Sequence, residues 1–120
     1  MKLRLRHNSV RLRLTQGEVT QLRDYGSVEE HIEFGPGQRL SYRIVSSANE
    51  STLRAEYRDG EVVLSTPAAM VADWADSSKV GMEATGPLRV LIEKDFECLA
   101  PSDPEDNRDT FPNPQHGKSC

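Results

Sequence analysis

Two runs of alternating apolar and charged residues open the chain, Lys2-Leu3-Arg4-Leu5-Arg6 and Val10-Arg11-Leu12-Arg13-Leu14. Alternation with a period of two is typical of strands that bury one face. The pattern changes parity at Asn8-Ser9, which predicts a two-residue hairpin turn at that point. In this register Leu5 lies opposite Leu12, and the hairpin forms the first part of an antiparallel sheet.

Six more strands are predicted from the same alternation between strong turn signals. Gly35-Pro36-Gly37 is one such signal, and we expect a five-residue loop, 35–39, that pairs Phe34 with Leu40. Asp59-Gly60 is the strongest hairpin signal in the chain. The six strands are expected at residues 28–34, 40–46, 53–58, 61–65, 79–84 and 88–95.

Two segments have the sequence features of short helices. Thr15 and Glu18 fit a capping box, and the apolar stripe and glycine that follow predict a helix over 16–25. Thr66-Pro67 fits an N-cap followed by proline at the first helical position. The apolar stripe of this second helix ends near Ser77-Ser78.

The predicted element order is therefore ββαββββαββ, followed by an irregular tail. This order is typical of the α+β class, and we expect one antiparallel sheet of about eight strands built from hairpins. Four of the seven prolines lie between residues 101 and 114, where they prevent a helix or a central strand. We expect a single α+β domain over 1–98 and a Pro/Asp-rich tail over 99–120, packed across the sheet with Phe111 buried.

The composition limits the class of protein. The chain has 120 residues, of which 36% are hydrophobic and 28% charged, and its net charge is −4. No apolar stretch approaches the roughly 18 residues that a bilayer crossing needs, and the N-terminus lacks the apolar core of a signal peptide. These values exclude a membrane protein, a disulfide-stapled miniprotein, a disordered chain and a generally basic nucleic-acid binder. We expect a cytoplasmic protein.

The first hairpin concentrates positive charge on one face. In the predicted register Arg4 faces Arg13 and Arg6 faces Arg11, and directly opposed like charges destabilise a sheet. Glutamates on neighbouring strands would offset the repulsion, and the candidates are Glu29, Glu33, Glu56, Glu61 and Glu93.

An anionic ligand is the alternative counter-charge, because arginine is suited to bidentate recognition of phosphate and carboxylate. The four arginines are therefore our candidate anion-binding site. Its partner would be a small anion or a protein, including the acidic tail of this chain or of a second copy in a homodimer.

Two other functions of the basic face are weaker. Residues 1–13 contain no aromatic side chain on which a nucleic-acid base could stack. If the sheet closed into a tunnel, the chain would be similar to the triphosphate tunnel phosphohydrolases, with Glu29, Glu33 or Glu93 holding a divalent metal. The first strand lacks the alternating glutamates with which those enzymes begin. No nucleophile elbow or phosphate-binding loop is present either, so the sequence favours binding over catalysis.

Cys98, His116 and Cys120 are candidate zinc ligands. The spacing of His116 and Cys120 occurs in small zinc sites, and Asp109, His31 or water would supply the fourth ligand. Alternatively, Cys98 is a small buried apolar residue and Cys120 belongs to a frayed terminus. In that case we expect no cofactor.

Both ends of the chain carry a resemblance to a family. Residues 1–6 and 8–15 resemble the start of an uncharacterised family of short bacterial proteins, a domain of unknown function. Residues 93–99, Glu105-Asp106 and 109–114 resemble its end. The resemblance covers the whole chain and implies a stand-alone bacterial protein. It implies no activity, cofactor or catalytic residue.

Overall fold

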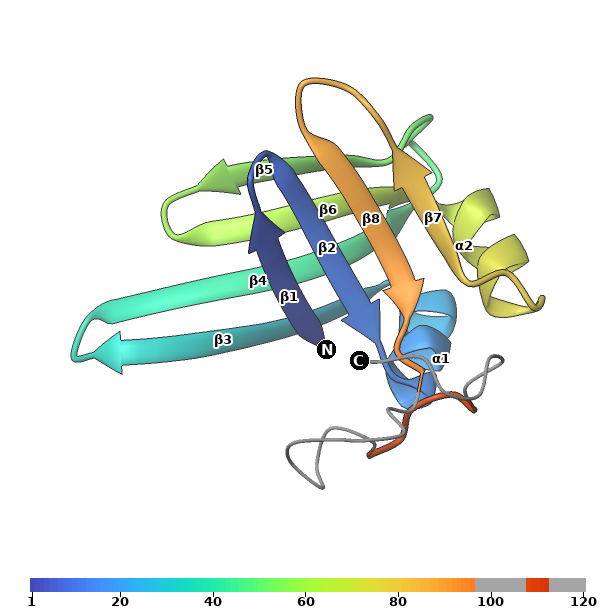
Figure 1. Ribbon diagram of the computed structural model, residues 1–120, viewed down its shortest axis with the longest axis horizontal. Coiled ribbons are helices and arrows are strands. Elements are labelled where there is room, and N and C mark those ends of the chain that lie inside the picture. The colour runs from blue at the N-terminus through green and yellow to red at the C-terminus, as the bar shows by residue number, and fades with distance from the viewer. Residues whose placement is uncertain (97–107, 113–120) are drawn as a thin grey trace.

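The computed structural model describes residues 1–96 and 108–112 (Figure 1). Its eight strands and two short helices follow the predicted order ββαββββαββ, which confirms that prediction. Neither helix of this described part has the length and apolar character needed to cross a membrane. The elements are β1 (Lys2–Arg6), β2 (Ser9–Leu14), α1 (Gln16–Tyr25), β3 (Ser27–Gly35), β4 (Gln38–Ser47), β5 (Arg54–Arg58), β6 (Glu61–Pro67), α2 (Ala68–Ala75), β7 (Gly81–Ala84) and β8 (Arg89–Lys94).

The strands form two four-stranded sheets, so the prediction of a single antiparallel sheet was wrong. Their strand orders are β1-β2-β8-β7 and β3-β4-β6-β5. In each sheet two antiparallel hairpins meet along a parallel pair, β2 with β8 and β4 with β6. Local turn signals specify the hairpins, whereas the parallel pairs join strands that are separated by other elements. The chain passes from the first sheet to the second through α1 and returns through α2.

The core lies between the two sheets, which are stacked with their strands crossing (Figure 1). The helices pack against each other at one side of the stack. The Trp74 indole is fully buried, and its Nε1 donates a hydrogen bond to the Val80 carbonyl at 3.0 Å. The largest side chains without solvent exposure are Leu12, Leu14, Leu22, Ile44, Leu64, Trp74 and Ile92.

The turn of the first hairpin lies at His7-Asn8, one residue before the predicted position. His7 adopts a positive φ of 51°, a conformation that histidine tolerates better than most residues. The Ser9 hydroxyl donates to the Arg6 carbonyl at 2.6 Å, and the Asn8 carbonyl accepts from the Arg89 amide at 3.1 Å. These bonds fix the turn within the fold. The pairing shifts by two residues, so every side chain stays on its predicted face.

The β3–β4 and β5–β6 hairpins differ in how well their sequences specify them. The Asp59-Gly60 turn has the predicted register, with Tyr57 opposite Val62, because both turn residues adopt the positive φ that a tight hairpin needs. The β3–β4 turn is tighter than the predicted five-residue loop 35–39. Gly35 pairs with Gln38, a bulge precedes it, and Leu40 therefore lies opposite Ile32 instead of Phe34.

Helix α1 has the predicted bounds. The Thr15 hydroxyl accepts a hydrogen bond from the Glu18 amide, Glu18 reaches back to the Thr15 amide, and Gly26 ends the helix with φ 88°. The predicted start of the second helix was wrong by one residue, because Pro67 occupies the N-cap position. Thr66 still belongs to β6, where its hydroxyl donates to the Val45 carbonyl at 2.6 Å.

The described part of the tail, residues 108–112, lies against the start of α1 and the end of β8. The rest of the predicted tail, 99–107 and 113–120, lies outside the described residues. Asp109 accepts hydrogen bonds from the Gln16 and Gly17 amides, both at 3.0 Å. The Phe111 amide donates to the Asp95 carbonyl at 2.7 Å. The Phe111 ring is partly buried beside Phe96, at 5.7 Å between ring centroids. This segment therefore connects the start of α1 to the end of β8.

Candidate functional site

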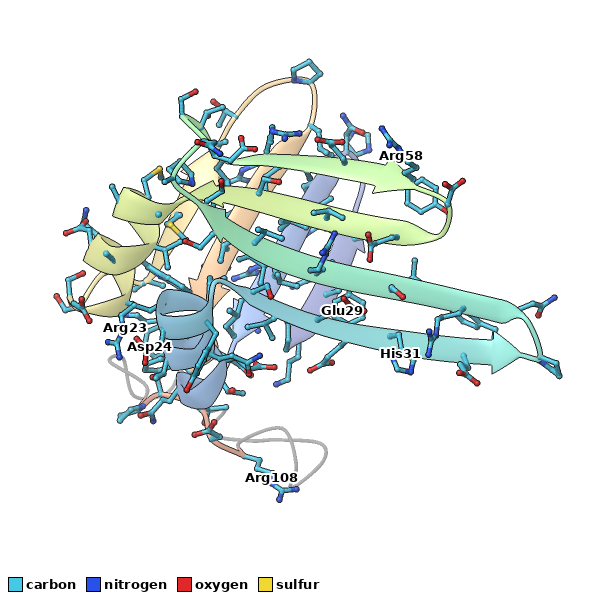
Figure 2. All side chains as sticks on the ribbon, turned by 180° about the vertical axis from the view of Figure 1, so that it is seen from behind. Arg23, Asp24, Glu29, His31, Arg58 and Arg108 are labelled. Carbon is cyan, nitrogen blue, oxygen red and sulfur yellow. The ribbon has the colours of Figure 1, made fainter. Side chains whose placement is uncertain are left out.

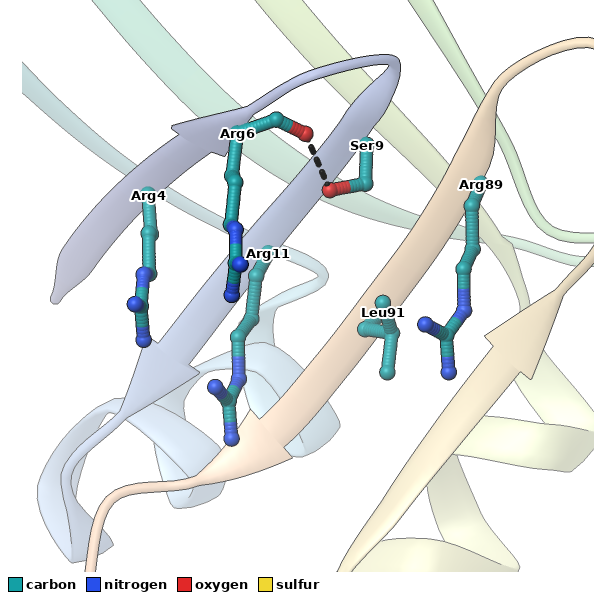
Figure 3. A pocket seen from close by; sticks show the side chains of 6 residues that line it. All are labelled: Arg4, Arg6, Ser9, Arg11, Arg89 and Leu91. Carbon is teal, nitrogen blue, oxygen red and sulfur yellow. Dashed lines mark hydrogen bonds between the residues drawn. The ribbon is translucent and has the colours of Figure 1, made fainter.

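Five arginines from three neighbouring strands share the outer face of the β1-β2-β8-β7 sheet. Across the ladders Arg4 lies opposite Arg11, Arg6 opposite Ser9, and Ser9 opposite Arg89. Figure 3 shows the arginine side chains extending in a common direction from the sheet. Four of the five arginines enclose a shallow pocket of about 250 Å³, which is lined by Arg4, Arg6, Ser9, Arg11, Arg89 and Leu91.

The structure assembles most of the predicted arginine set but with different neighbours. The predicted pairs Arg4–Arg13 and Arg6–Arg11 were wrong, because the turn lies one residue earlier than expected. Arg13 instead pairs with Lys2 on one side and with Glu93 on the other, outside the pocket. The positive face is therefore retained, but its centre moves toward the turn of the hairpin.

Arg89 is the pocket residue that the sequence analysis missed. It reaches the pocket through the parallel β2–β8 pairing, in which Arg89 is the partner of Ser9. Strand β8 alternates between outward Arg89, Leu91 and Glu93 and buried Val90 and Ile92. That alternation was the available signal for an outward arginine, but no local signal places β8 beside β2.

The arginines of the pocket differ in their carboxylate partners. Arg11 donates from Nε to Glu93, and Arg89 donates from Nε to Glu83 at 2.6 Å. Each bond uses Nε, and a guanidinium has four further N–H groups on its terminal nitrogens. Arg4 and Arg6 make no ion pair with any residue in the ranges 1–96 and 108–112. Two of the four pocket guanidinium groups therefore lack a counter-charge within the part of the chain that the structure describes.

The pKa of Arg13 is shifted by its surroundings beside the pocket. Its side chain is half-buried, and this burial, together with the neighbouring Arg11, lowers the pKa of its guanidinium from the usual value. Glu93 and Asp95 act in the opposite direction and do not fully compensate. The shift therefore reflects desolvation of the Arg13 guanidinium first and repulsion by the neighbouring arginines second.

Among the predicted glutamate counter-charges, Glu93 is the one that reaches the arginine pocket. The other four lie on the second sheet, where three of them form described ion pairs: Arg39–Glu33 at 3.6 Å, Arg43–Glu61 at 3.3 Å and Arg54 with Glu56. Figure 2 shows Glu29 and His31 on β3, seen from the outer side of that sheet. The closed tunnel needed for the phosphohydrolase alternative does not form among these eight strands, because they build two separate sheets.

The zinc prediction lies outside the described residues, because Cys98, His116 and Cys120 all fall in the ranges 97–107 and 113–120. Asp109, a proposed fourth ligand, caps α1 instead, and His31 lies beside Arg39, whose Nη2 is 3.1 Å from the imidazole Nε2. Within residues 1–96 and 108–112, no group of three His, Cys, Asp or Glu side chains could hold a metal ion.

A second polar cluster, at the edge of the core, was also missed. The Met1 α-amino group donates to Glu18 at 2.7 Å and to Glu30 at 3.0 Å, and the Tyr42 hydroxyl donates to Glu30 at 2.9 Å. Burial and the bond to Glu30 raise the pKa of Tyr42 to about 12. Glu30 interrupts the apolar alternation of Val28 and Ile32, and that interruption was the signal for a buried polar partner.

Comparison with known proteins gives a family but no function. No curated protein matches the chain, and no solved structure does. A family model described as a family of unknown function, DUF7009, matches residues 1–115. This match confirms the resemblance to an uncharacterised domain family, while the bacterial origin stays a prediction. The chain with the exposed arginine pocket therefore belongs to the DUF7009 family, whose function is unknown.

Proposed function

We propose that this protein is a non-catalytic binding module whose arginine pocket takes a small phosphate-bearing anion. The single observation that carries this proposal is the convergence of four arginines on one pocket in which Arg4 and Arg6 have no described counter-charge. Placing like charges together without partners destabilises the free sheet. A bound anion removes that cost, because it supplies the missing counter-charge.

The chemistry of the pocket favours phosphate over other anions. Guanidinium groups form paired, planar hydrogen bonds to phosphate oxygens, and four such groups surround one pocket. The Ser9 hydroxyl already donates to the Arg6 carbonyl, and the Leu91 side chain contributes an apolar wall. The volume of about 250 Å³ is below the range typical of drug-sized ligands. It suits a compact anion such as pyrophosphate or tripolyphosphate.

Calorimetric titration with tripolyphosphate at low salt tests the proposal. The parent protein should bind it, and the affinity should fall as salt screens the open pocket. The double variant Arg4→Ala/Arg6→Ala should bind about 100-fold more weakly, since a hydrogen bond to a charged group contributes about 1.5–3 kcal/mol and 1.4 kcal/mol corresponds to tenfold.

Arg58→Ala is the matched control, because Arg58 is an exposed arginine on the opposite sheet (Figure 2). It should leave the affinity unchanged. No binding by the parent protein, or equal binding by the double variant, would overturn the proposal. Release of orthophosphate from tripolyphosphate in the presence of Mg²⁺ would overturn its non-catalytic part.

A further inference from the structure

A strip of large apolar side chains is exposed beside the edge of the sheet stack. Figure 1 shows the free ends of the β3–β4 and β5–β6 hairpins extending past β1, so this part of their sheet is uncovered. Ile32 is 46% exposed, and Leu5, Phe34 and Tyr57 are 62–70% exposed. Leu5 and Tyr57 lie opposite the buried Val10 and Val62, respectively, in their ladders. The strip therefore continues the inner, apolar faces of the two sheets.

Three of the four side chains in this strip lie on the sheet edges β1 and β3, and Tyr57 lies on β5, the other edge of the second sheet. Strand β1 is the outer strand of its sheet, and β3 is the outer strand of the other. One side of each edge strand has backbone N–H and C=O groups that no neighbouring strand satisfies, and such edges are templates for pairing with another chain. An exposed apolar strip between two such edges is typical of an interaction surface.

The two edges carry opposite charges on alternate positions. Strand β1 presents Lys2, Arg4 and Arg6, and β3 presents Glu29, His31 and Glu33, all exposed. Glu33 also pairs with Arg39 of its own sheet at 3.6 Å. Two copies of β1 would repel each other, and so would two copies of β3, because like charges directly opposite destabilise a pair. Antiparallel pairing of β1 with β3 that sets Leu5 opposite Ile32 instead places Arg4 opposite Glu33 and Arg6 opposite His31. Among the pairings of these two edges, the charge pattern favours β1 with β3.

We infer that the protein forms a symmetric homodimer in which β1 of each copy lies beside β3 of the other. Two-fold symmetry repeats the contact, so each dimer contains it twice. Each contact joins a basic edge to an acidic edge and covers the exposed apolar strip. This inference goes beyond the proposed anion binding. Arg4 and Arg6 belong both to the pocket and to the β1 edge, whereas Arg11, Arg89 and Leu91 line the pocket and take no part in the dimer contact.

Sedimentation velocity of the parent protein and of Phe34→Asp tests the apolar part of the contact. The parent should sediment as a dimer and Phe34→Asp as a folded monomer, with folding checked by circular dichroism. Tyr25→Asp is the control, because Tyr25 is 84% exposed on α1 and belongs to neither edge strand, and it should remain dimeric. A monomeric parent protein, or a dimeric Phe34→Asp variant, would overturn the inference.

Charge reversal tests the pairing of the edges. Arg4→Glu/Arg6→Glu and Glu29→Arg/Glu33→Arg should each be monomeric, because each leaves two like-charged edges in both contacts of the dimer. An equimolar mixture of the two variants should form a heterodimer, in which both contacts again join opposite charges. A mixture that stays monomeric would contradict β1–β3 pairing.

Failure of the dimer and failure of anion binding are distinguishable. The monomeric Phe34→Asp variant keeps all the pocket residues, so it should still bind tripolyphosphate in the calorimetric titration. If it is monomeric and binds tripolyphosphate, the pocket works without the dimer and both proposals stand. A dimeric parent protein that does not bind tripolyphosphate would retain the dimer and remove the proposed function.

Discussion

Arg4 lies directly opposite Arg11 in the β1–β2 ladder, yet the two residues differ in their partners. Arg11 donates to Glu93, whereas Arg4 makes no ion pair within residues 1–96 and 108–112. An opposed pair of like charges with one counter-charge leaves an excess of positive charge on the sheet. This relationship is the basis for expecting a ligand at the outer face.

Removal of the Arg4 guanidinium should stabilise the ligand-free protein. Arg4→Ala relieves cross-strand repulsion, which we expect to increase the free energy of unfolding by about 0.2–1 kcal/mol at low ionic strength. Urea unfolding measures the change. Arg11→Ala is the matched variant and should instead destabilise, because it leaves Glu93 without its described partner. If Arg4→Ala and Arg11→Ala change the free energy of unfolding equally, the two arginines do not differ in their counter-charge.

The same comparison at high salt provides a second check. Salt screens exposed charges beyond a few ångströms, so the stabilisation of Arg4→Ala should shrink as ionic strength rises. A gain in stability that does not depend on salt would mean that the Arg4 side chain affects folding through packing and not through charge.

The tail segment should contribute measurably to the stability of α1. Asp109→Ala removes the Oδ2 acceptor that the Gly17 amide uses at 3.0 Å, and loss of such a cap costs about 1 kcal/mol. Asp109→Asn is the control, because its side chain keeps an acceptor oxygen and tolerates the positive φ of 55° at this position. In thermal unfolding, the parent protein and Asp109→Asn should both have a higher melting temperature than Asp109→Ala. If Asp109→Ala has the same melting temperature as the parent protein, the capping contact does not contribute to stability.

The contribution of the Met1–Glu18 ion pair to the free energy of unfolding should be lost at both low and high pH. Burial alone would raise the pKa of Glu18, but hydrogen bonds from the Met1 amino group and Thr15 lower it. Its contribution is therefore present above the usual carboxyl pKa and is lost as the pH falls through the lowered value. Burial would likewise lower the pKa of the Met1 amino group, but its bonds to Glu18 and Glu30 raise it. That contribution is complete below its usual pKa, near 8, and is lost as the pH rises through the raised value.

Urea unfolding across this pH range measures the effect of the pair. The parent protein should be most stable between about pH 5 and 8. Glu18→Gln should lower that maximum and flatten both flanks of the profile. If the profiles of Glu18→Gln and the parent run parallel, the pair does not couple folding to protonation.

The sequence predicts the parts of the fold that depend on local signals. The capping box at Thr15 and Glu18 and the Asp59-Gly60 turn each satisfy the backbone within a few residues, and both predictions are confirmed. The turn at His7-Asn8 was misplaced because either register keeps the same residues on the same face. Contacts of Asn8 with the β7–β8 connection decide between the registers, and these contacts depend on the folded sheet.

The candidate site was only partly predictable for the same reason. Arg4, Arg6 and Arg11 belong to one hairpin, and alternation alone places them on one face. Arg89 is distant in the chain and joins them only through the parallel β2–β8 pair. The prediction of one antiparallel sheet had no such pair, so it could not bring β8 to the pocket.

The most direct test of the central claim is to observe the arginine side chains while the anion binds. In a nitrogen-15 NMR titration with tripolyphosphate, the Nε–Hε signals of Arg4, Arg6, Arg11 and Arg89 should shift together and saturate with one binding curve. The signal of Arg58, on the opposite sheet, should stay in place. Equal small shifts of all arginine signals without saturation would contradict a specific anion site on this face.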